Sequence, residues 1–502
     1  MSGFPKMALG ELCEKITDGT HHSPTNLPAG QYKYVTAKNI KSWGLDLANL
    51  TYVDEATHRE IYSRCDVRKG DVLYVKDGAT TGTACVNPLD EEFSLLSSVG
   101  VLRPGPALKS KYLLYALQEP HTKSVMMDNV AGVAITRLTL KKLASAEIFV
   151  APPACQDRIV ATLDELLSDL DAGVAELQAA QKKLTQYRQS LLKAAVEGAL
   201  TAAWRAQHPP AEPGAQLLQR ILTERRARWE ARQLDRFKSQ GKTPPPGWQK
   251  KYVEPVQPDT TGLPALPQGW VWASLSQVGW LDRGRSKHRP RNAPHLYGGA
   301  YPFVQTGDIR HADTFLKEVE ATYSDAGLEQ SRLWPVGTMC ITIAANIGKT
   351  AILSMAACFP DSVVGFLAGS NDVSIRYVEY FMRSVQQRLE DEAPATAQKN
   401  INLEILEKVA IPVPPIQEQL QIVTLVDDAM SGATENGHAI DWALKQSTAQ
   451  RQNILRAAFS GQLVPQDPRD EPASALLARI RAERAAQAPA RKPRGRKTQE
   501  VA

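Results

Sequence analysis

Several residue types that can bind phosphate or metal occur in this chain, but the rest of the corresponding functional motif is missing in each case. Ile347-Gly-Lys-Thr looks like a phosphate-binding loop, but that loop needs glycine five positions before Gly348, where this chain has Ile343. His21 and His22 could bind a metal ion, yet no acidic or cysteine partner stands at ligand spacing. The chain contains no G-x-S-x-G elbow and no Asp/Asn-Pro-Pro-Tyr sequence. These patterns favour a binding protein over an enzyme.

Charge is distributed unevenly along the chain. The 502 residues include 59 Lys and Arg against 54 Asp and Glu, a formal net charge of +5 that permits an anionic partner without requiring one. Residues 220–251 contain ten basic and three acidic residues, which predicts either a solvated helix face or contact with nucleic acid or an acidic partner. Residues 283–291 contain five basic residues and no acid, whereas residues 1–150 are nearly balanced, with 17 basic and 16 acidic.

The chain contains one sequence pattern twice, at an offset of 263 residues. Gln156, Ile159 and Val160 match Gln419, Ile422 and Val423, and Gly198 falls on Gly461. Further on, AQLLQRILTERRARW from Ala215 recurs as SALLARIRAERAA from Ser474. Collinear matches of this kind indicate a duplication. Each half is a variable module of roughly 150 residues followed by a better matched helical segment.

Two long helices are expected in the matched segments. From Gln156 to Leu200 apolar residues recur at alternating steps of three and four, which is a heptad seam. The second copy, residues 417–463, has a less regular seam. Two helices with open apolar seams most simply pack on each other, antiparallel if a pseudo-twofold axis relates the halves. A further helix, rich in arginine, is predicted over Leu217–Gln233.

The variable modules have the composition of mixed α/β structure. Short β-type runs are predicted at Tyr32–Val35, Val72–Val75, Val99–Arg103, Tyr301–Gln305, Met339–Ile343 and Val363–Phe366, with short helices at Lys111–Glu119 and Arg376–Glu390. The predicted fold class is α+β, with two mixed α/β modules separated by two long antiparallel, coiled-coil-like helices in a pseudo-twofold internal repeat. The expected segments are residues 1–150, 151–210, 211–264, 265–412, 413–465 and 466–502, the last a short helix and a basic disordered tail.

The cellular setting is predicted from cysteine usage and hydropathy. Six scattered cysteines form no C-x-x-C pair, and no apolar run approaches the ~18 residues of a membrane span. The first residues have no signal-peptide pattern. We therefore expect a cytoplasmic protein that does not contact a membrane.

A variable module and a matched helix, followed by both again, resemble the specificity subunit of type I restriction–modification systems over essentially the whole chain. The sequences that carry the resemblance are Ile16-Thr-Asp-Gly-Thr-His-His, Lys69-Gly-Asp-Val-Leu, Gly78-Ala-Thr-Thr-Gly-Thr, Ala151-Pro-Pro, Glu224-Arg-Arg-Ala-Arg-Trp, Lys250-Lys-Tyr, Leu266-Pro-Gln-Gly-Trp-Val-Trp and Pro414-Pro-Ile-Gln-Glu-Gln. Each is a weak pattern alone, and their order and duplication make the set specific.

The resemblance implies a prokaryotic subunit that catalyses nothing and holds no cofactor. Each module would be a target recognition domain for one half of a split sequence in double-stranded DNA, and the long helices would hold the two domains apart like a ruler. Two methyltransferase (M) subunits would supply S-adenosylmethionine and methylate adenine at N6. Two restriction (R) subunits, which are motor nucleases using ATP and Mg²⁺, would cut unmodified DNA.

Candidate DNA contacts follow from the polar turns and basic loops of each module. Lys and Arg suit phosphates, Arg suits guanine edges, and Asn and Gln suit adenine edges. In the first module the candidates are Thr17, Asp18, His21, His22, Lys38, Asn39, Lys76, Thr80 and Thr81. In the second they are Arg283, Arg285, Lys287, His288, Arg289, Arg291, Gln305, Asn346, Lys349, Gln398, Lys399 and Asn400. Simple turn formation around Asp18 and Gly78, and a merely solvated basic loop, are the competing interpretations.

Two other functions compete with DNA recognition. A coiled-coil scaffold or adaptor with two protein-binding modules explains the helices and the modest charge, but not two diverged modules with basic loops. A fused enzyme is disfavoured because no catalytic motif is present and no unassigned stretch is large enough for a catalytic domain.

Overall fold

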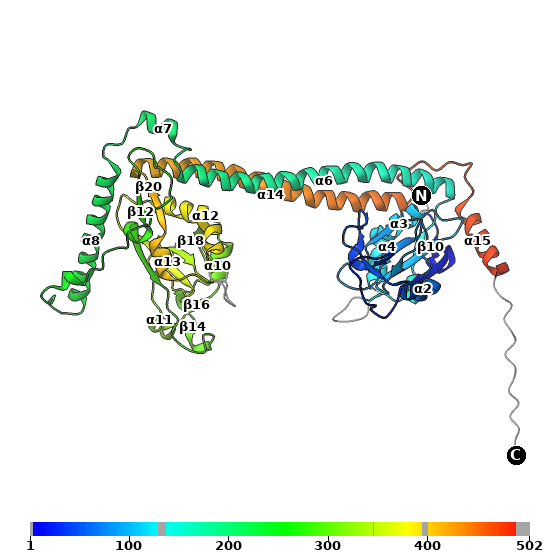
Figure 1. Cartoon of the computed structure of the whole chain (residues 1–502), viewed down its shortest axis with the longest axis horizontal. Coiled ribbons are helices and arrows are strands. Elements are labelled where there is room, and N and C mark those ends of the chain that lie inside the picture. Colours follow the sequence, from blue (N-terminus) through cyan, green and yellow to red (C-terminus); the bar gives the residue numbers. More distant parts are fainter. Residues whose placement is uncertain (1–3, 129–136, 345, 394–399, 488–502) are drawn as a thin grey trace, which may run out of the picture. The chain divides into compact units, whose positions relative to one another are not determined.

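Two long helices and two α/β modules build the chain. The computed structural model describes residues 4–128, 137–344, 346–393 and 400–487. It divides into unit 1, Met1–Ala179 with Ile440–Ala502, and unit 2, Ala180–Ala439. The boundaries fall inside the helices α6 (Pro153–Val196) and α14 (Ile416–Phe459), so each long helix contributes one part to each unit (Figure 1).

Unit 1 contains module 1, which extends from β1 (Lys6–Ala8) to β11 (Glu147–Phe149), two strands that pair with each other. Its main sheet has the order β2-β10-β7-β8, with the bounds Cys13–Asp18, Val99–Pro104, Val72–Val75 and Ala84–Val86. β2 and β7 are both antiparallel to β10 and are therefore parallel to each other. Their carboxyl ends lie at the same edge of the sheet.

Unit 2 contains module 2, which extends from β12 (Val271–Ser274) to its partner β20 (Ala410–Val413). Its main sheet has the order β13-β19-β17-β18-β15, with the bounds Gly279–Arg283, Val363–Ala368, Met339–Thr342, Thr350–Leu353 and Phe315–Leu316. β13 and β17 are both antiparallel to β19. The first three strands therefore repeat the arrangement of β2, β10 and β7, and the predicted internal repeat extends to the sheet topology.

Smaller elements complete each module. In module 1 they are α1 (Leu9–Leu12), β3 (Tyr32–Val35), η1 (Ala37–Asn39), β4 (Ile40–Lys41), β5 (Gly44–Leu45), β6 (Thr51–Val53), α2 (Glu55–Arg64), β9 (Ser94–Leu95), α3 (Ser110–Gln118), α4 (Pro120–Asp128) and α5 (Leu140–Ser145). In module 2 they are α9 (Leu275–Val278), η3 (Pro294–Leu296), β14 (Tyr297–Pro302), α10 (Thr306–His311), β16 (Thr322–Tyr323), α11 (Asp325–Glu329), α12 (Ile375–Asp391) and α13 (Leu403–Lys408).

The two long helices end by the same device. Gly198 and Gly461 adopt left-handed φ angles of 76° and 78° just beyond the last helical residues. Leu200 N–H then donates to the Ala194 carbonyl at 3.1 Å, and Leu463 N–H to the Ala457 carbonyl at 3.1 Å. A left-handed glycine is a common helix terminator because it has no Cβ to clash. The helices therefore end at Val196 and Phe459, a few residues before the predicted ends.

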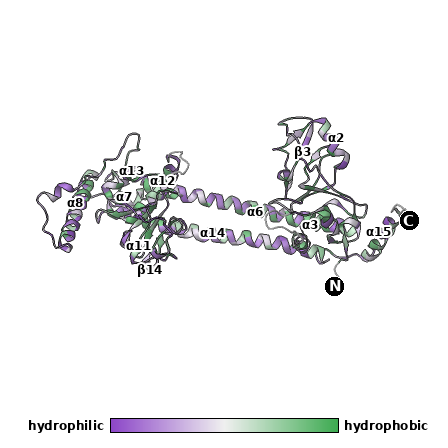
Figure 2. Ribbon diagram, turned by 90° about the horizontal axis from the view of Figure 1, so that it is seen from below, coloured by the Kyte–Doolittle hydropathy of each residue, from purple (hydrophilic) through white to green (hydrophobic). Residues whose placement is uncertain are grey.

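Within each unit the two helices run antiparallel, as predicted. In unit 1, Ile159 and Leu163 share a core with Leu455 and Phe459, and Asp171 further along α6 pairs with Arg451. In unit 2, Arg188 donates to the Ala433 carbonyl at 3.0 Å, and Leu191 and Leu192 share a core with Ile422 and Val426. Figure 2 shows hydrophilic colour along much of both helices and hydrophobic residues gathered around α3.

Most predicted β-runs are confirmed, with one correction. β3 and β7 have the predicted bounds, and β10, β17 and β19 lie within two residues of them. The predicted strand Tyr301–Gln305 is wrong beyond Pro302. Gln305 caps α10 instead, because its N–H donates to the Asp308 carboxylate at 2.7 Å and so ends the extended run.

Two further linker helices and a C-terminal helix follow the long helices. α7 (Ala202–Gln207) and α8 (Gly214–Ser239) lie between α6 and module 2, and α15 (Ala473–Gln487) follows α14. α8 is longer than the predicted helix Leu217–Gln233 at both ends. No helix in the described part of the chain has the length and apolar character needed to cross a membrane.

Candidate nucleic-acid interface

In module 1 the sheet topology brings two predicted turns together. Because β2 and β7 are parallel, the residues that follow them, Asp18–His22 and Lys76–Thr81, emerge at the same edge. Lys76 Nζ lies 3.2 Å from the Asp18 carboxylate, which joins the two turns directly. Arg137 lies beside the same turn through a β-bridge with Asp77 and an ion pair of 3.6 Å. We call this set of loops edge 1.

Two of the predicted contacts at edge 1 are buried, and we reassign them. The Lys76 and Asp18 side chains are only 2% and 5% exposed. Lys76 also lies 3.4 Å from Asp77, and Arg64 donates to the Asp18 carboxylate at 2.9 Å. A buried lysine that is paired with two carboxylates would lose both ion pairs if it turned toward a phosphate. Asp18 and Lys76 therefore position the loops and are not included in the proposed DNA contacts.

Asn39 is a third predicted contact that has a positioning role. Its side-chain oxygen accepts the Thr36 N–H at 3.0 Å, and its amide group donates to the Asp46 and Asn49 carbonyls. The side chain is buried, so its hydrogen-bonding groups face the protein. Its neighbour Lys38 is exposed and remains a candidate for a phosphate contact.

The accessible side chains at edge 1 are small or singly charged. His21 and His22 are exposed, with His21 Nε2 3.5 Å from Asp18, and Thr80 is exposed at the tip of the second turn. Thr17 and Thr81 are half-buried, and the Thr81 hydroxyl donates to the Gly78 carbonyl at 2.6 Å. The sequence patterns missed Arg64 and Arg137, which are 51% and 59% exposed. The match of Arg137 to Asn400 in the repeat was the available signal for the second.

Module 2 places its predicted residues at the equivalent edge. The basic loop 283–291 follows β13, and Asn346 and Lys349 lie in the turn between β17 and β18. Asn400 bridges Ala344, and Ile401 N–H donates to the Ile343 carbonyl at 2.9 Å. Arg283, Asn346 and Asn400 are thus brought to one edge, which we call edge 2. Gln398 and Lys399 lie outside the described residues.

Three members of the basic loop hold its conformation. Arg291 Nη2 donates to both oxygens of the Asp361 carboxylate at 2.7 and 2.8 Å, and Arg283 donates to the Asp361 carbonyl at 2.6 and 3.0 Å. Arg289 donates to the carbonyls of Ser286 and His288 at 2.7 and 2.8 Å. These bonds tie the three guanidinium groups to the protein, although all three residues are exposed. They give these three side chains a role in holding the loop conformation.

Arg285 and Lys287 are the two cations of this loop that take no part in these side-chain bonds. Both are exposed, and neither forms any of the ion pairs found among the described residues. The backbone around Arg285 is fixed independently of its side chain. Its N–H donates to the Phe359 carbonyl at 3.0 Å, and its carbonyl accepts from Ser331 at 2.8 Å. The hydrogen-bonded backbone thus holds the Arg285 and Lys287 side chains toward solvent.

The remaining candidates of module 2 surround this loop. His288 is half-buried, with its N–H donating to the Gln330 side chain at 3.0 Å. Gln305 is exposed, and the strand-like segment before it bridges Cys358, next to the residue that anchors Arg285. Asn346 and Lys349 are half-buried, and Asn400 is exposed. Edge 2 therefore offers both cations and amide side chains to a ligand.

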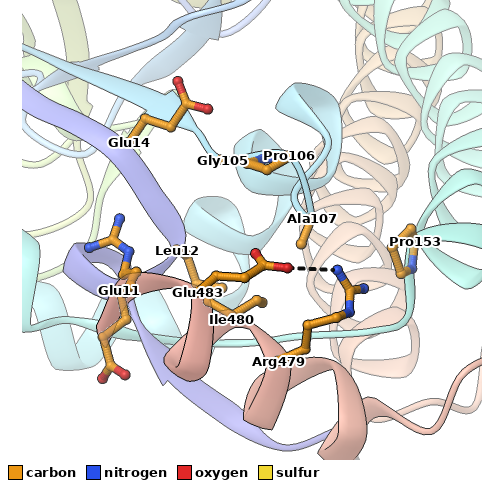
Figure 3. Close-up of a pocket in the computed structure, with 11 residues that line it drawn as sticks. Glu11, Leu12, Glu14, Gly105, Pro106, Ala107, Pro153, Arg479, Ile480 and Glu483 are labelled. Carbon is orange, nitrogen blue, oxygen red and sulfur yellow. Dashed lines mark hydrogen bonds and ion pairs between the residues drawn. The ribbon is translucent and has the colours of Figure 1, made fainter. Parts of the chain in front are cut away.

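The described residues contain no group of three or more His, Cys, Asp or Glu that could hold a metal ion. A cavity of about 770 Å³ does occur in unit 1, lined by Glu11, Glu14, Glu483, Arg479, Arg484 and Ala107 among others (Figure 3). It includes Gly105, which follows the carboxyl end of β10. Since β10 runs antiparallel to β2, this cavity lies at the end of the sheet opposite edge 1 and is not part of the candidate interface.

Comparison with known proteins adds the family. The sequence model described as "Type I restriction modification DNA specificity domain" matches residues 1–178 and 267–444. The specificity subunit of the type I restriction enzyme EcoKI, from Escherichia coli strain K12, is 24% identical over 475 residues, covering 90% of this chain and 88% of that protein. The EcoDI specificity subunit of Escherichia coli is 23% identical over 425 residues, covering 81% and 84%.

A solved structure shares the fold. It is described as the structural basis of complex assembly and conformational transition of the type I restriction–modification system. The match has a TM-score of 0.63 at 17% sequence identity, and it covers 92% of this chain and 98% of that one. Since the family sequence model matches twice and spans more than two thirds of the residues, the chain belongs to the family of type I restriction–modification DNA specificity subunits.

Proposed function

We propose that this chain is the DNA-recognition subunit of a type I restriction–modification complex and that each module reads one half of a split DNA sequence. The observation that carries the proposal is the repeated edge. In both modules two parallel strands deliver polar or basic loops to one end of the sheet, while the loop residues themselves differ. Equivalent strands that carry different loop residues suit two half-sites of different sequence.

The chemistry of the exposed side chains predicts which residues of each edge contact phosphates and which contact bases. Arg285, Lys287 and Lys38 are exposed cations that suit phosphates and would supply position and salt-dependent affinity. Gln305, Asn346 and Asn400 carry amides that suit adenine edges, and His21, His22 and Thr80 are the accessible polar groups of module 1. The buried pairs around Asp18 and the guanidinium bonds to Asp361 would hold these loops in place.

The long helices would set the distance between half-sites. α6 and α14 each have 44 residues, which corresponds to about 66 Å of helix at 1.5 Å per residue. Both pass from one unit into the other, so a change in their length changes the connection between the modules. The number of unread base pairs between the half-sites should follow.

The partners are those of the family. We propose that the chain assembles with two methyltransferase subunits, which bring S-adenosylmethionine, and with two restriction subunits, which bring ATP and Mg²⁺. The chain itself would hold no cofactor and catalyse no step. A target adenine must leave the base stack for methylation, and the pocket that receives it would belong to the methyltransferase. The working location would be the prokaryotic cytoplasm.

The direct test is methylation mapping in a host that expresses the partner methyltransferase with and without this chain. We expect a split motif with methylated adenine that appears only with the chain. No motif, despite an expressed and active methyltransferase, would reject the proposal and favour the adaptor interpretation.

The ruler is tested by inserting four residues after Leu177 in α6 and after Ile440 in α14, which are equivalent positions of the repeat. We expect a changed spacer between unchanged half-sites. Insertion of four residues in the linker after Thr260 is the matched control and should leave the spacer as it was. Altered bases in either half-site would contradict the ruler.

A further inference from the structure

α8 and α15 are counterparts in the repeat over their first turns. Leu217, Ile221 and Arg225 match Leu476, Ile480 and Arg484 of α15, and both helices pack these residues on the first elements of a module. The structure describes α15 as far as Gln487, and α8 continues to Ser239 and returns through η2 (Trp248–Lys251). We call residues 226–252, the end of α8 together with the chain that returns through η2, the α8 arm.

The α8 arm is a firmly folded hairpin. Trp229 stacks on Trp248 with ring centroids 5.7 Å apart, and Tyr252 and Phe237 contact the same pair edge-on at 5.3 and 6.0 Å. Gly247, with φ 73°, makes the turn into η2. Aromatic contacts of this kind contribute roughly 0.5–1.5 kcal/mol each beyond burial. The aromatic rings thus face one another inside the hairpin.

The outside of the α8 arm is positively charged. Residues 226–252 contain eight Lys and Arg but only Glu230 and Asp235 as acids. Arg226 and Arg228 pair with nearby glutamates. Five further cations are exposed and take no part in the ion pairs found among the described residues: Arg236, Lys238, Lys242, Lys250 and Lys251. They come from the end of α8, the connecting turn and η2, so the charge is concentrated at the hairpin.

The α8 arm is joined to module 2 along the strand that leads to edge 2. Arg225 donates to the Gly279 carbonyl at 3.4 Å, and the Arg232 guanidinium lies 3.6 Å from the ring centroid of Trp280 in β13. Burial and the positive charges of Arg225, Arg332 and Arg228 lower the pKa of Arg232. β13 continues directly into the basic loop. Figure 1 shows α8 running beside module 2 on the same side of the helix pair.

We propose that the α8 arm binds the phosphates of duplex DNA next to the half-site read by module 2, without regard to sequence. The inference rests on the proposed function and adds a second, non-specific contact to it. Mobile lysines on a charged surface suit a phosphate backbone. A protein partner would instead need a cluster of accessible aromatic and apolar side chains. Trp248 is buried inside the hairpin, and the markedly exposed large apolar side chains in this described part of the chain are Leu234 and, just beyond the arm, Val253.

The test compares two double variants in the assembled methyltransferase complex. Lys250→Ala with Lys251→Ala removes two free cations of the α8 arm. Lys193→Ala with Lys408→Ala removes two exposed cations of unit 2 that already pair with a glutamate one turn away. The probes are a duplex that carries the mapped motif and a scrambled duplex of equal length, each measured over a range of salt concentrations.

We expect the arm variant to lose affinity for both duplexes by the same factor, about tenfold to a hundredfold near 0.1 M salt, and to reduce the salt slope by about two. The control variant should match the wild type. Reversing Lys238, Lys242, Lys250 and Lys251 to glutamate should enlarge the loss. Hydrogen exchange of α8 establishes that the α8 arm remains folded.

Three outcomes would overturn the proposal. Unchanged affinity and slope in both arm variants would show that the arm does not touch DNA. Loss of methyltransferase assembly with unchanged DNA binding would identify an acidic protein surface as the partner. A loss confined to the motif duplex would mean that the arm reads sequence. A wild-type complex that binds both duplexes equally would instead reject the proposed function, while the salt slope would still report on the arm.

Discussion

In each unit the start of one long helix contacts the segment after the end of the other long helix and the first residues of the module. We call this contact the joint, and it is polar in unit 2 and apolar in unit 1. In unit 2 the buried Glu418 carboxylate accepts bonds from Thr201, Arg205 and Trp270 at 2.7, 2.9 and 2.8 Å. In unit 1 the equivalent positions are Cys155 for Glu418, Val464 for Thr201 and Phe4 for Trp270, and all three lie in an apolar core cluster. The helix ends around them have the same geometry, so the backbone of the joint does not dictate its polarity.

One side chain is nevertheless the same in both joints. Gln156 accepts the Lys109 N–H at 2.9 Å and donates to the carbonyls of Ala107 and Ala151. Gln419 accepts the Ser374 N–H at 2.8 Å and donates to the carbonyls of Asp372 and Pro414. The glutamine ties a module to its long helix through backbone groups, and this bonding does not depend on which side chains the module carries. The comparison teaches that the duplicated frame is held by backbone-directed bonds while its side-chain chemistry has diverged.

The largest expected effect separates the two joints. Glu418→Ala leaves the half-buried Arg205, an indole N–H and a hydroxyl without this acceptor, and should cost unit 2 about 3–5 kcal/mol. Cys155→Ala, the equivalent change in unit 1, removes one buried sulfur and should cost about 1 kcal/mol. Hydrogen exchange read separately on peptides of each unit measures both. Equal costs would show that the Glu418 network contributes no more than packing.

The second prediction concerns the shared glutamine. Gln156→Ala and Gln419→Ala each remove three hydrogen bonds and leave buried carbonyls unpaired, so each should cost about 2 kcal/mol in its own unit. The two losses should agree within the error of the exchange measurement. A clearly smaller loss in one unit would mean that its module is held by other contacts.

The third prediction concerns the difference in charge between the two edges. Arg285→Ala with Lys287→Ala should weaken binding of the assembled methyltransferase to motif DNA about tenfold or more and reduce the salt slope by about two. Lys38→Ala in module 1 should reduce the slope by about one. Assembly of the complex should stay intact in both. Undiminished affinity of the double variant at moderate salt would remove the basic loop from the interface.

The smallest effect is an acid sensitivity that arises from Asp66 in module 1. Burial raises the pKa of Asp66, but hydrogen bonds from Lys15 and Arg103 outweigh it and lower that pKa from 3.8 to about 2. The equivalent positions in module 2 include Leu333 and Leu367, which cannot form this network. A depressed carboxyl pKa stabilises the fold above its unfolded value, and that contribution is lost as the pH falls from about 4 to about 2.

Because Asp66 is partly accessible to water, its contribution should stay below about 1 kcal/mol. Asp66→Asn should lower the stability of unit 1 at neutral pH, and the difference from the wild type should vanish near pH 2. Unit 2 should show no change. A difference that persists at pH 2 would mean that asparagine disturbs the packing and not the charge network.

The duplication made much of the fold predictable, while the site depended on long-range pairing. The matched segments predicted both long helices, with ends a few residues beyond Val196 and Phe459, and short β-type runs predicted β3 and β7 to the residue. The burial of Lys76 could not be predicted, because its partner Asp18 lies on another strand and Arg64 comes from α2. Arg289 likewise looked like a free cation in the sequence. Only the folded loop shows that it bonds to its own backbone.

The central claim is that each module reads one half of a split target. The most direct measurement is methylation mapping after residues 271–413, module 2, are exchanged for the corresponding module of the EcoKI specificity subunit. The account predicts that one half of the methylated motif changes, while the other half and the spacer length stay the same. A motif in which both halves change, or in which neither does, would contradict it.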